Sequence, residues 1–317
     1  MDYKYNFSFI IPHKNIPELL RRCVSSIPRR NDVQIIVVDD NSDPEFVDFE
    51  HFPFLGAPNI KVIFDKSGLR AGHARNIGLQ YVEGKWILFA DSDDFFFYSI
   101  NKAMDDCLRS DADIIYYRST NLDSNTYKAD TTRSGVTNTS IDMYLNHKAF
   151  GEDYVRYRHP APWGKFIRSS MIQSNNIVFA EVIKANDALF SIQCGFYAKK
   201  IEVHDISLYC LTTREGNVTS VFSPEALYAV ATTETDLMRF MIDRNINNTP
   251  VFTIWENDVF ASLLGLKESH DELYKKACRY IKVRGFTEQY IAKRLEYIAN
   301  GRKKAKIVSA VRKLLHI

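Results

Sequence analysis

Aspartates gather at two points in the first hundred residues, and each group directly follows a run of apolar residues. Asp39 and Asp40 end the stretch VQIIVVDD, and Asp91, Asp93 and Asp94 follow the apolar run WILFA. Carboxylates this close repel one another unless a cation lies between them. A hard divalent cation such as Mn²⁺ or Mg²⁺ binds carboxylate oxygens and leaves coordination positions for the oxygens of a diphosphate. Asp91 and Asp93 are therefore candidate metal ligands.

Each aspartate group also has a simpler interpretation. Asp is common in turns and helix caps, so an isolated Asp-x-Asp step is more typical of a turn than of a metal site. Asp40 has the same two interpretations, because a carboxylate there could cap a helix or accept hydrogen bonds from a nucleotide base or ribose. We interpret Asp94, the acid without a ligand role, as a cap at the start of the following helix.

Basic residues supply further candidates around these acids. Lys14, Lys66, Arg70 and Arg75 could meet phosphate groups, although a single basic residue is more often a solvated surface group. The stretch GLRAGHARNIG is neither a Walker loop nor a Gly-x-Gly-x-x-Gly turn after a strand. The sequence therefore supports neither kinase nor dehydrogenase chemistry.

The surrounding pattern places these residues at the ends of strands. Four continuous apolar runs predict buried strands, at residues 7–12, 33–40, 60–65 and 86–91. Two stretches with helical spacing predict helices between them, at residues 16–27 and 71–82, the second closed by Gly84. This alternation predicts a parallel sheet covered by helices on both faces, with ligands bound beyond the carboxyl ends of the strands. There His13, Lys14 and Asn15 would join the aspartates.

The rest of the chain alternates less regularly and ends in helices. Further elements are predicted as strands at residues 111–119 and 201–213, a polar excursion or hairpin at 121–140, and helices towards 172 and at 185–198. Beyond residue 223, helices are predicted at 224–242, 251–266 and 271–297, followed by a basic tail. We therefore predict an α/β domain over residues 1–220 and a helical region over residues 221–317.

The order of the motifs resembles one known family. Pro-x-x-Asn after the first strand, Asp-Asp-Asn-Ser after the second, the ARNIG stretch and Asp-Ser-Asp-Asp after the fourth strand are similar to the nucleotide-sugar-binding half of a family 2 glycosyltransferase. The resemblance is strong over residues 7–97, continues through 161–172, 179–192 and 213–219, and fades beyond about residue 222. It implies a GT-A fold, a Rossmann-like and mostly parallel sheet flanked by helices, with a helical C-terminal extension.

The resemblance implies roles on the side of the sugar donor. Asp40 would hydrogen-bond the base, Asp91 would hold the ribose or support the metal, and Asp93 would ligate the Mn²⁺ or Mg²⁺ that bridges the diphosphate. Arg75 would lie near Asp91 or the donor. The residues expected to bind the donor are Pro12, His13, Lys14, Asn15, Asp40, Asn41, Lys66, Gly68, Arg75, Asp91, Ser92 and Asp93.

The resemblance also implies a catalytic base. Asp187, in the stretch ANDALF, falls where the family has its general base, and Glu181 is the alternative. Asn186 stands where family members usually have Glu. This replacement removes a negative charge beside Asp187, so we expect a less strongly raised pKa for that carboxyl.

Four residues are expected to contact the acceptor or the diphosphate, namely Trp163, Lys165, Glu181 and Arg214. Trp163 and Lys165 match the acceptor-side Trp-Gly-Lys step of the family, and Arg214 is expected to reach the diphosphate. His159 and Trp163 are candidate sugar contacts, with an ordinary core position as the alternative for Trp163. Lys14 replaces the aromatic residue that is usual in the first motif, which leaves the details of base recognition open.

These roles imply an inverting, metal-dependent hexosyl- or N-acetylhexosaminyltransferase. Its donor would be a nucleoside-diphosphate sugar, expected to be UDP-linked, and its acceptor a glycan or lipid-linked hydroxyl in bacterial surface-polysaccharide synthesis. Direct displacement needs a base on the acceptor hydroxyl and a stabilised leaving diphosphate, which Asp187 and a metal provide. The alternative, prompted by Asn186, is a non-catalytic nucleotide-sugar-binding or scaffold subunit. A nucleotidyltransferase would need a glycine-rich basic signature near the first strand, which is missing.

The net charge of the chain is only +2, a value that gives no overall attraction to nucleic acid. The strongest asymmetry in the distribution of charge is the basic tail. Residues 301–316 contain lysines and arginines but no acid, and their apolar residues fall on one side of a helix. This pattern is typical of a helix at an anionic membrane surface. The alternative is packing on the chain's own domain or on a second subunit of a homodimer.

The remaining features indicate the cellular location. The five cysteines are scattered without a Cys-x-x-Cys pair, which is typical of reduced thiols in the cytosol. No signal peptide opens the chain, and no run of 18 apolar residues is present. We therefore expect a cytoplasmic protein, peripheral at the inner face of the plasma membrane if the tail binds there.

Overall fold

The computed structural model describes residues 2–129, 134–214 and 223–315, with side chains described as far as Lys303. The chain divides into two compact units. The α/β unit comprises Met1–Val182 and Asn186–Asn217, and the helical unit comprises Ile183–Ala185 and Val218–Ile317. The boundary predicted near residue 220 lies outside the described residues.

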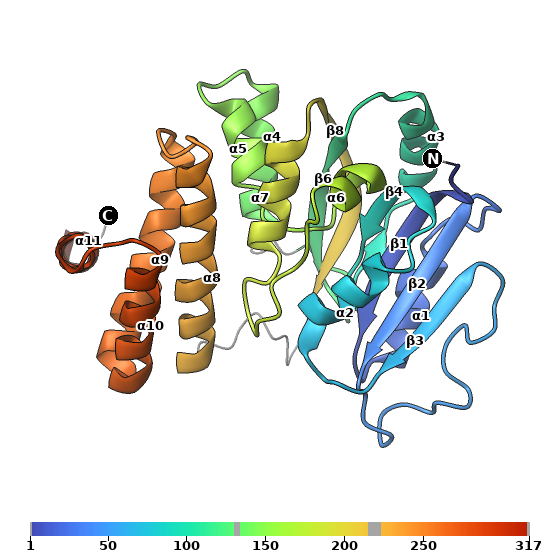
Figure 1. Ribbon diagram of the computed structural model, residues 1–317, viewed down its shortest axis with the longest axis horizontal. Coiled ribbons are helices and arrows are strands. Elements are labelled where there is room, and N and C mark those ends of the chain that lie inside the picture. The colour runs from blue at the N-terminus through green and yellow to red at the C-terminus, as the bar shows by residue number, and fades with distance from the viewer. Residues whose placement is uncertain (1, 130–133, 215–222, 316–317) are drawn as a thin grey trace. The chain divides into compact units, whose positions relative to one another are not determined.

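The α/β unit is built on one sheet with strand order β3-β2-β1-β4-β7-β6-β8-β5 (Figure 1). Four neighbouring strands are parallel, namely β3 (Ile60–Asp65), β2 (Val33–Asp40), β1 (Tyr5–His13) and β4 (Gly84–Phe89). The other four are β7 (Lys165–Arg168), β6 (Ile114–Asp123), β8 (Ile201–Thr213) and β5 (Phe95–Phe96). Here β6 pairs parallel with β8, whereas β7 and β5 run antiparallel to their neighbours. The predicted mostly parallel sheet is therefore confirmed.

The parallel strands bring the predicted aspartates to one edge of the sheet. In the pairing of β1 with β2, His13 lies opposite Asp39 at the carboxyl ends of both strands. On the other side of β1, β4 ends at Phe89, two residues before Asp91. Because the four strands point the same way, the residues that follow them emerge at a shared edge, where α/β sheets bind ligands.

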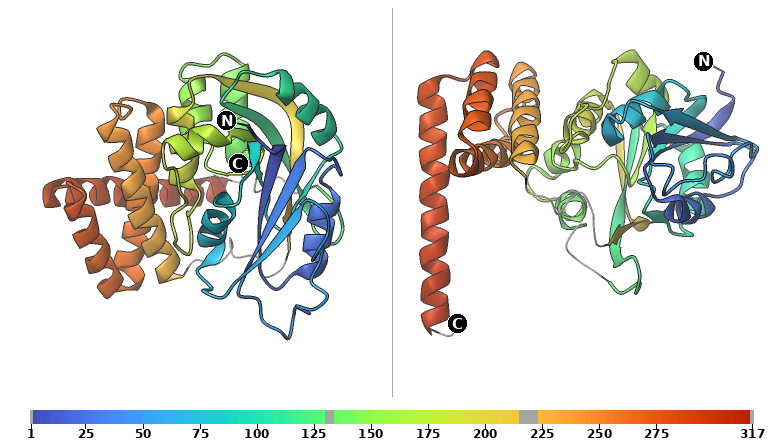
Figure 2. Two further views of the ribbon diagram at one scale, coloured as in Figure 1. Left: turned by 45° about the vertical axis from the view of Figure 1, so that its right-hand side comes forward. Right: turned by 90° about the horizontal axis from the view of Figure 1, so that it is seen from below.

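Apolar cores cover both faces of the sheet. Side chains alternate along a strand, so Phe7 and Phe9 of β1 lie in one core and Ile10 lies in the other. The first core is completed by α1 (Pro17–Ser25) and α3 (Ile100–Arg109). The second is completed by α2 (Arg70–Leu79), α4 (Gly135–Leu145), α5 (Gly151–Tyr157), α6 (Ser169–Ser174) and α7 (Ala188–Tyr197). Figures 1 and 2 show the helices on the two sides of the strands.

Several elements of this unit differ from the prediction. Gly84 begins β4 instead of closing the preceding helix. A Cβ at this position would come within 2.7 Å of the backbone of Ser8 on the paired strand, which explains why the residue is a glycine. The region expected to run into a helix after Trp163 first forms β7, a strand too short for periodicity to separate it from a helical turn. The polar excursion predicted at residues 121–140 contains the end of β6 and the first turns of α4.

The helical unit contains α8 (Pro224–Asp243), α9 (Pro250–Ser269), α10 (Asp271–Val283) and α11 (Glu288–Leu315). Helices α8 and α9 match the predicted helices and pack through buried residues such as Leu237, Met241, Phe260 and Leu263. The predicted single helix at 271–297 is wrong. Gly285 has a φ of +92°, a backbone conformation that residues with a side chain rarely adopt, and this glycine separates α10 from α11.

The basic tail is part of α11, which Figure 2 shows as one long helix. Its side chains from residue 304 onward lie outside the described residues, so the proposed membrane-facing side stays a prediction. Within the described part of the chain, no helix has both the length and the apolar character needed to cross a membrane.

Candidate functional site

The first of the two strand-end aspartates, Asp39, holds the backbone in place. Its carboxylate lies 2.8 Å from Nδ1 of His13 and accepts hydrogen bonds from the backbone N–H and hydroxyl of Ser42. Because Nε2 of His13 accepts from the N–H of Ile16, its Nδ1 carries the hydrogen and donates to Asp39. Burial acts to raise the pKa of Asp39, but the bonds from His13 and Ser42 outweigh it and lower that pKa. The His13 side chain is fully buried, and its two hydrogen bonds hold Asp39 and the backbone of Ile16 in place.

Asp40 follows Asp39 and is the last residue of β2. Its Oδ1 accepts from the N–H of Arg70 at 3.0 Å, which links β2 to the start of α2. Nζ of Lys14 donates to the carbonyl of Asp40 at 2.9 Å and lies 3.5 Å from its Oδ2. The structure therefore brings Lys14 and Asp40, two residues predicted to bind the donor, into direct contact.

Two asparagines in the left-handed region shape the same rim. Asn15 has φ 60° and Asn41 has φ 54°, a conformation that Asn tolerates better than most residues. The N–H of Asn41 donates to the carbonyl of Asp65, and a Cβ at Gly68 would lie 3.6 Å from the Asn41 side chain. Lys66, by contrast, is exposed and lies over the Phe49 ring, with its Nζ 4.7 Å from the ring centroid.

Arg75 joins the second aspartate group to the predicted catalytic segment. It is only 4% exposed, and its Nη2 lies 2.5 Å from Oδ1 of Asp91. Its Nη1 donates to Oδ1 of Asn186 at 2.9 Å, and its guanidinium packs against the Phe179 ring. Residues more than a hundred positions apart are thereby fixed side by side. Since Asn186 is neutral, Asp91 is the carboxylate that pairs with this guanidinium.

The turn that contains Asp93 is held by its backbone and leaves its carboxylate accessible. The carbonyl of Asp93 accepts from the Arg22 guanidinium and from the hydroxyl of Thr212 at 2.6 Å. The side chain is about 20% exposed, and its Oδ2 lies 3.4 Å from Nε of Arg214. Ser92 between the two aspartates is buried. The structure thus brings Arg214 to the predicted metal ligand, and its contact with a diphosphate stays a prediction.

The interpretation of Asp94 as a helix cap is wrong, because α3 begins only at Ile100. Asp94 is 1% exposed and accepts from the N–H of Thr212 at 2.7 Å and from the hydroxyl of Tyr209 at 2.8 Å. The same hydroxyl accepts from the N–H of Asp91. Burial, with Asp93 and Asp91 nearby, raises the pKa of Asp94 well above its usual value. Asp94 therefore fastens the turn to β8.

Of the two candidate bases, Asp187 has the more suitable environment. It lies directly before α7 and is partly exposed, and burial raises its pKa although Arg75 acts in the opposite direction. Glu181 is exposed and hydrogen-bonded to His73 at 2.8 Å and to Asn76, and the bond with His73 is the main cause of its lowered pKa. A raised pKa brings a carboxylate closer to the proton affinity that a general base needs at neutral pH.

The residues of the Trp-Gly-Lys step lie deeper than a direct ligand contact requires. Trp163 is 8% exposed and stacks on Tyr209 with ring centroids 5.3 Å apart, which supports its alternative interpretation as a core residue. Lys165 is 1% exposed and donates to the carbonyl of His159 at 2.8 Å. His159 is also buried, and both of its ring nitrogens lack a hydrogen-bond partner among the described residues.

Sequence reasoning missed the residues that hold the site from β8 and α1. Tyr209 bonds to Asp91 across 118 positions, and Arg22 reaches Asp93 across 71 positions. No spacing rule connects residues so far apart, and neither residue belongs to a recognisable motif. Only the pairing of β8 with β5 and β6 brings Tyr209 and Thr212 to the turn.

The donor set at the turn suits part of the coordination shell of a hard cation. Within the described residues, no group of three His, Cys, Asp or Glu side chains could hold a metal ion. Asp91 and Asp93 offer carboxylate oxygens that are about 28% and 20% exposed. Mg²⁺ commonly takes one or two protein carboxylates and completes its shell with phosphate oxygens and water. The residues therefore fit a metal bound together with a diphosphate.

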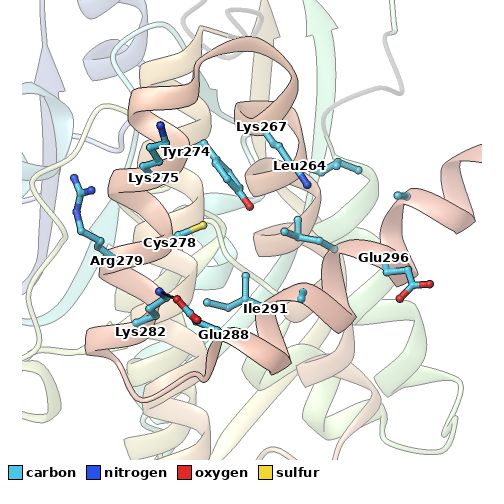
Figure 3. Close-up of a pocket in the computed structure, with 13 residues that line it drawn as sticks. Leu264, Lys267, Tyr274, Lys275, Cys278, Arg279, Lys282, Glu288, Ile291 and Glu296 are labelled. Atoms are coloured by element: carbon cyan, nitrogen blue, oxygen red, sulfur yellow. Dashed lines mark hydrogen bonds and ion pairs between the residues drawn. The ribbon is translucent and has the colours of Figure 1, made fainter.

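A separate groove lies in the helical unit, between the end of α9 and the facing sides of α10 and α11 (Figure 3). Its volume is about 590 Å³, and Tyr274, Cys278 and Ile291 are among the residues that line it. None of the predicted site residues lines this groove. The candidate site therefore lies at the carboxyl edge of the sheet and is distinct from the groove.

The mostly parallel sheet, with the Asp-Ser-Asp turn at its carboxyl edge, has a GT-A glycosyltransferase fold. Residues 8–164 match the family model described as Glycosyl transferase family 2, and the chain belongs to that family. Among curated relatives, the poly(ribitol-phosphate) beta-N-acetylglucosaminyltransferase TarS of Staphylococcus aureus is 27% identical over 243 residues, which cover 71% of this chain and 39% of TarS. The uncharacterized glycosyltransferase EpsJ of Bacillus subtilis is 25% identical, covering 68% of this chain and 63% of EpsJ.

Solved structures show the same fold. The structure of S. aureus TarS residues 1–349 in complex with UDP-GlcNAc aligns with a TM-score of 0.61 at 19% identity, covering 94% of this chain and 92% of that one. The mannosyltransferase PcManGT from Pyrobaculum calidifontis, solved with GDP-Man and Mn²⁺, aligns with a TM-score of 0.53 at 12% identity, covering 98% of this chain and 88% of that one. The chain spans about two fifths of the length of TarS, the first of these curated relatives.

Proposed function

We propose that the protein is an inverting, metal-dependent glycosyltransferase that moves a sugar from a nucleoside-diphosphate sugar to an acceptor hydroxyl. One observation carries the proposal: Arg75 binds Asp91 at 2.5 Å and Asn186 at 2.9 Å. Asn186 directly precedes Asp187, so this bridge keeps a carboxylate with a raised pKa next to the turn that offers Asp93. A base and a leaving-group site on adjacent segments are the two parts that direct displacement requires.

In this proposal Asp187 accepts the proton of the acceptor hydroxyl while the oxygen attacks the anomeric carbon. The bond from that carbon to the diphosphate breaks, and the diphosphate departs with the electron pair. A divalent cation bound by Asp93, with Asp91 beside it, would supply positive charge against the departing diphosphate. Arg214, 3.4 Å from Asp93, adds a second positive charge at the same place.

The donor is proposed to be UDP-linked. TarS has been solved in complex with UDP-GlcNAc and with UDP, and PcManGT with GDP-Man and Mn²⁺. TarS and the poly(ribitol-phosphate) beta-glucosyltransferase of Bacillus spizizenii, a relative of 27% identity, are named for transfer of N-acetylglucosamine and glucose. These names support a UDP-linked hexose or N-acetylhexosamine as the donor. The identity of the nucleotide base is the first property to measure.

The acceptor is proposed to be a glycan or lipid-linked hydroxyl in surface-polysaccharide synthesis. The relatives named for poly(ribitol-phosphate) and teichoic acid support an acceptor of this kind. The protein would work in the cytoplasm, with α11 resting on the inner face of the membrane through its lysines and arginines. A homodimer formed through the same helix is the competing use of that surface.

Calorimetry with UDP, GDP and dTDP, each with and without Mn²⁺, tests the proposal. UDP is expected to bind with an affinity that rises with Mn²⁺, and Asp93→Ala is expected to lose that rise and donor hydrolysis. Asp187→Ala should bind UDP as the parent does and stop transfer. Failure of all three nucleotides to bind, or full transfer by Asp187→Ala, would overturn the proposal.

A non-catalytic nucleotide-sugar-binding or scaffold subunit is the second candidate, and Asn186 is the observation that favours it. Such a subunit would bind UDP without releasing UDP from UDP-GlcNAc or UDP-glucose under any condition. Turnover that disappears in Asp187→Ala excludes this alternative, and binding without turnover supports it.

A further inference from the structure

Arg22 of α1 is a partly buried guanidinium that contacts four separate segments around the Asp-Ser-Asp turn. Its Nη2 donates to the carbonyl of Asp93 and, at 3.3 Å, to the hydroxyl of Thr212 on β8. Its Nη1 donates to the hydroxyl of Ser124, directly after β6, at 3.3 Å. The guanidinium carbon also lies 5.3 Å from the centroid of the Phe95 ring on β5. One side chain therefore joins α1 to the turn and to the ends of β6 and β8.

The hydrogen bonds of Arg22 all end on neutral oxygens. Within the described residues, no carboxylate forms an ion pair with this guanidinium, and its Nε is buried without a hydrogen-bond partner. A charged group that loses contact with water is costly to the fold unless it is paired. An apolar side chain of similar length avoids that cost. Stability alone therefore does not explain an arginine at this position, and its bond to Asp93 points to the candidate site.

Thr212 shares the contact of Arg22 with the turn. The Thr212 hydroxyl has one hydrogen, which it donates to the carbonyl of Asp93 at 2.6 Å, so its oxygen is left to accept from Arg22. The Asp93 carbonyl thus accepts from both Arg22 and Thr212. The N–H of Thr212 donates to Asp94 at 2.7 Å. The turn is therefore fixed to β8 at two successive residues, and Arg22 connects this attachment to α1.

The other hydrogen bond of Arg22 supports the segment that leads to Arg214. The N–H of Ser124 donates to the carbonyl of Thr213 at 2.8 Å, so the bond from Arg22 to Ser124 acts on the residue immediately before Arg214. Nε of Arg214 lies 3.4 Å from Oδ2 of Asp93. Arg22 therefore binds Asp93 directly and supports Arg214 through Ser124 and Thr213.

We propose that Arg22 is a positioning residue that holds Asp93 and Arg214 at a fixed separation, as joint binding of a metal and a diphosphate requires. The inference rests on the proposed function, in which Asp93 binds the cation and Arg214 adds positive charge beside it. Without the guanidinium, the turn and the segment before Arg214 lose their common support. Changes to a residue that orients a metal ligand typically lower metal affinity about 10–100-fold.

A double-mutant cycle on UDP affinity tests this link. Calorimetry measures UDP binding in the presence of Mn²⁺ for the parent, Arg22→Met, Arg214→Met and the double variant. Both single variants are expected to bind UDP more weakly, and the product of their two fold-losses is expected to exceed the loss in the double variant by about threefold or more. The reason is that Arg214, once its support is removed, has less binding to contribute. A loss in the double variant equal to that product overturns the inference.

Arg21 supplies the matched control. It neighbours Arg22 on α1 but pairs with Glu18 at the surface, with Nε 3.4 Å from the carboxylate. The Arg21→Met and Arg214→Met double variant should therefore bind UDP as Arg214→Met alone does. This comparison separates a specific effect of Arg22 from the loss of any positive charge on α1.

Ser124→Ala replaces Arg22→Met in the cycle if circular dichroism shows that Arg22→Met does not fold. This variant removes one acceptor of the guanidinium and leaves the backbone bond from residue 124 to Thr213. The double variant with Arg214→Met is again expected to lose less UDP affinity than the product of the single losses. Losses that multiply overturn the inference here as well.

Binding of Mn²⁺ supplies a readout that does not depend on turnover. Electron paramagnetic resonance measures the Mn²⁺ bound by each protein at saturating UDP. Arg22→Met is expected to bind Mn²⁺ about tenfold more weakly than the parent, and Arg22→Lys, which keeps the charge without the planar fork, is expected to lie between them. Equal Mn²⁺ affinity in the parent and Arg22→Met overturns the inference. A parent that binds neither UDP nor Mn²⁺ contradicts the proposed function itself, whereas normal binding by the parent with losses that multiply contradicts only the role of Arg22.

Discussion

Replacing Lys165 by methionine is expected to stabilise the α/β unit at neutral pH, the opposite of what most core substitutions do. The pKa of Lys165 falls from its ordinary 10.5 to about 7, and burial is the largest cause. This difference of about 3.5 pH units, at 1.36 kcal/mol per unit, corresponds to about 5 kcal/mol of free energy that burial of the charge costs the fold. Methionine has a similar length and no charge, so it escapes that cost.

The substitution also removes one hydrogen bond. Without the ammonium, the buried carbonyl of His159 loses its donor at 2.8 Å, and an unsatisfied buried acceptor costs about 1–3 kcal/mol. The net gain for Lys165→Met at pH 7 is therefore about 2–4 kcal/mol.

The sign of this difference should reverse with pH. Between pH 7 and 10.5 the unfolded chain binds a proton at Lys165 that the folded chain has released, so the stability of the parent rises with pH across this window. The variant lacks this rise. Above the window only the lost hydrogen bond remains, and Lys165→Met is expected to be less stable than the parent by about 1–3 kcal/mol.

Urea unfolding at pH 6, 7.5 and 9 measures how the advantage of Lys165→Met falls as the pH rises. The helical unit contains Trp255, so both proteins are compared in a Trp255→Phe background, in which fluorescence reports Trp86 and Trp163 of the α/β unit. A variant that is less stable than the parent at pH 6 and shares its pH slope would show that Lys165 carries no buried-charge cost, and the reasoning would fail.

Three further outcomes are expected. Tyr209→Phe removes the hydroxyl that accepts from the N–H of Asp91 and donates to Asp94, so urea unfolding should show a loss of about 1–3 kcal/mol and calorimetry should show weaker UDP binding. Arg75→Met leaves the carboxylate of Asp91, about 28% exposed, without its guanidinium and should lower both stability and UDP affinity, measured in the same two assays. A chain ending at Asn300 should sediment with anionic liposomes less than the full chain does, because it lacks the basic residues of the tail.

Matched controls separate these effects from general damage. Tyr98 is 89% exposed, so Tyr98→Phe should change neither stability nor UDP binding. Arg21 forms a surface pair with Glu18, and Arg21→Met should leave UDP affinity unchanged. Neutral liposomes should bind neither chain, and equal binding of both chains to anionic liposomes would end the proposal for the tail.

The parallel half of the fold was predictable because its information is local. Each strand from β1 to β4 is a continuous apolar run, and parallel strands must end at one edge, so the meeting of the two aspartate groups followed from the pattern. The two strands that run antiparallel to their neighbours, β7 and β5, were not predictable in the same way. The four residues of β7 are too few to show a period, and its partners β4 and β6 are distant in sequence.

The candidate site shows the same difference between local and long-range information. Residues next to a strand end, such as Asp40 and Asp93, could be found by position, whereas their supports could not. Asp39 and Asp94 looked equivalent to their neighbours, yet both accept hydrogen bonds in the interior from residues whose positions only the folded chain defines. Asp94 is buried and fastens the turn, whereas the adjacent Asp93 is about 20% exposed. Asp39 and Asp40 are both buried, and both accept hydrogen bonds from backbone N–H groups. The sequence does not indicate these different roles, because all four residues are aspartates.

The charge balance around Asp187 gives a physical reason for the departure at Asn186. A glutamate at this position would place a second carboxylate on Arg75 and a negative charge beside the base, and both changes would raise the pKa of Asp187 further. With asparagine, Arg75 keeps its hydrogen bond and the field at Asp187 stays less negative. A less negative field favours the ionised form of the Asp187 carboxylate, so the asparagine is compatible with a working base.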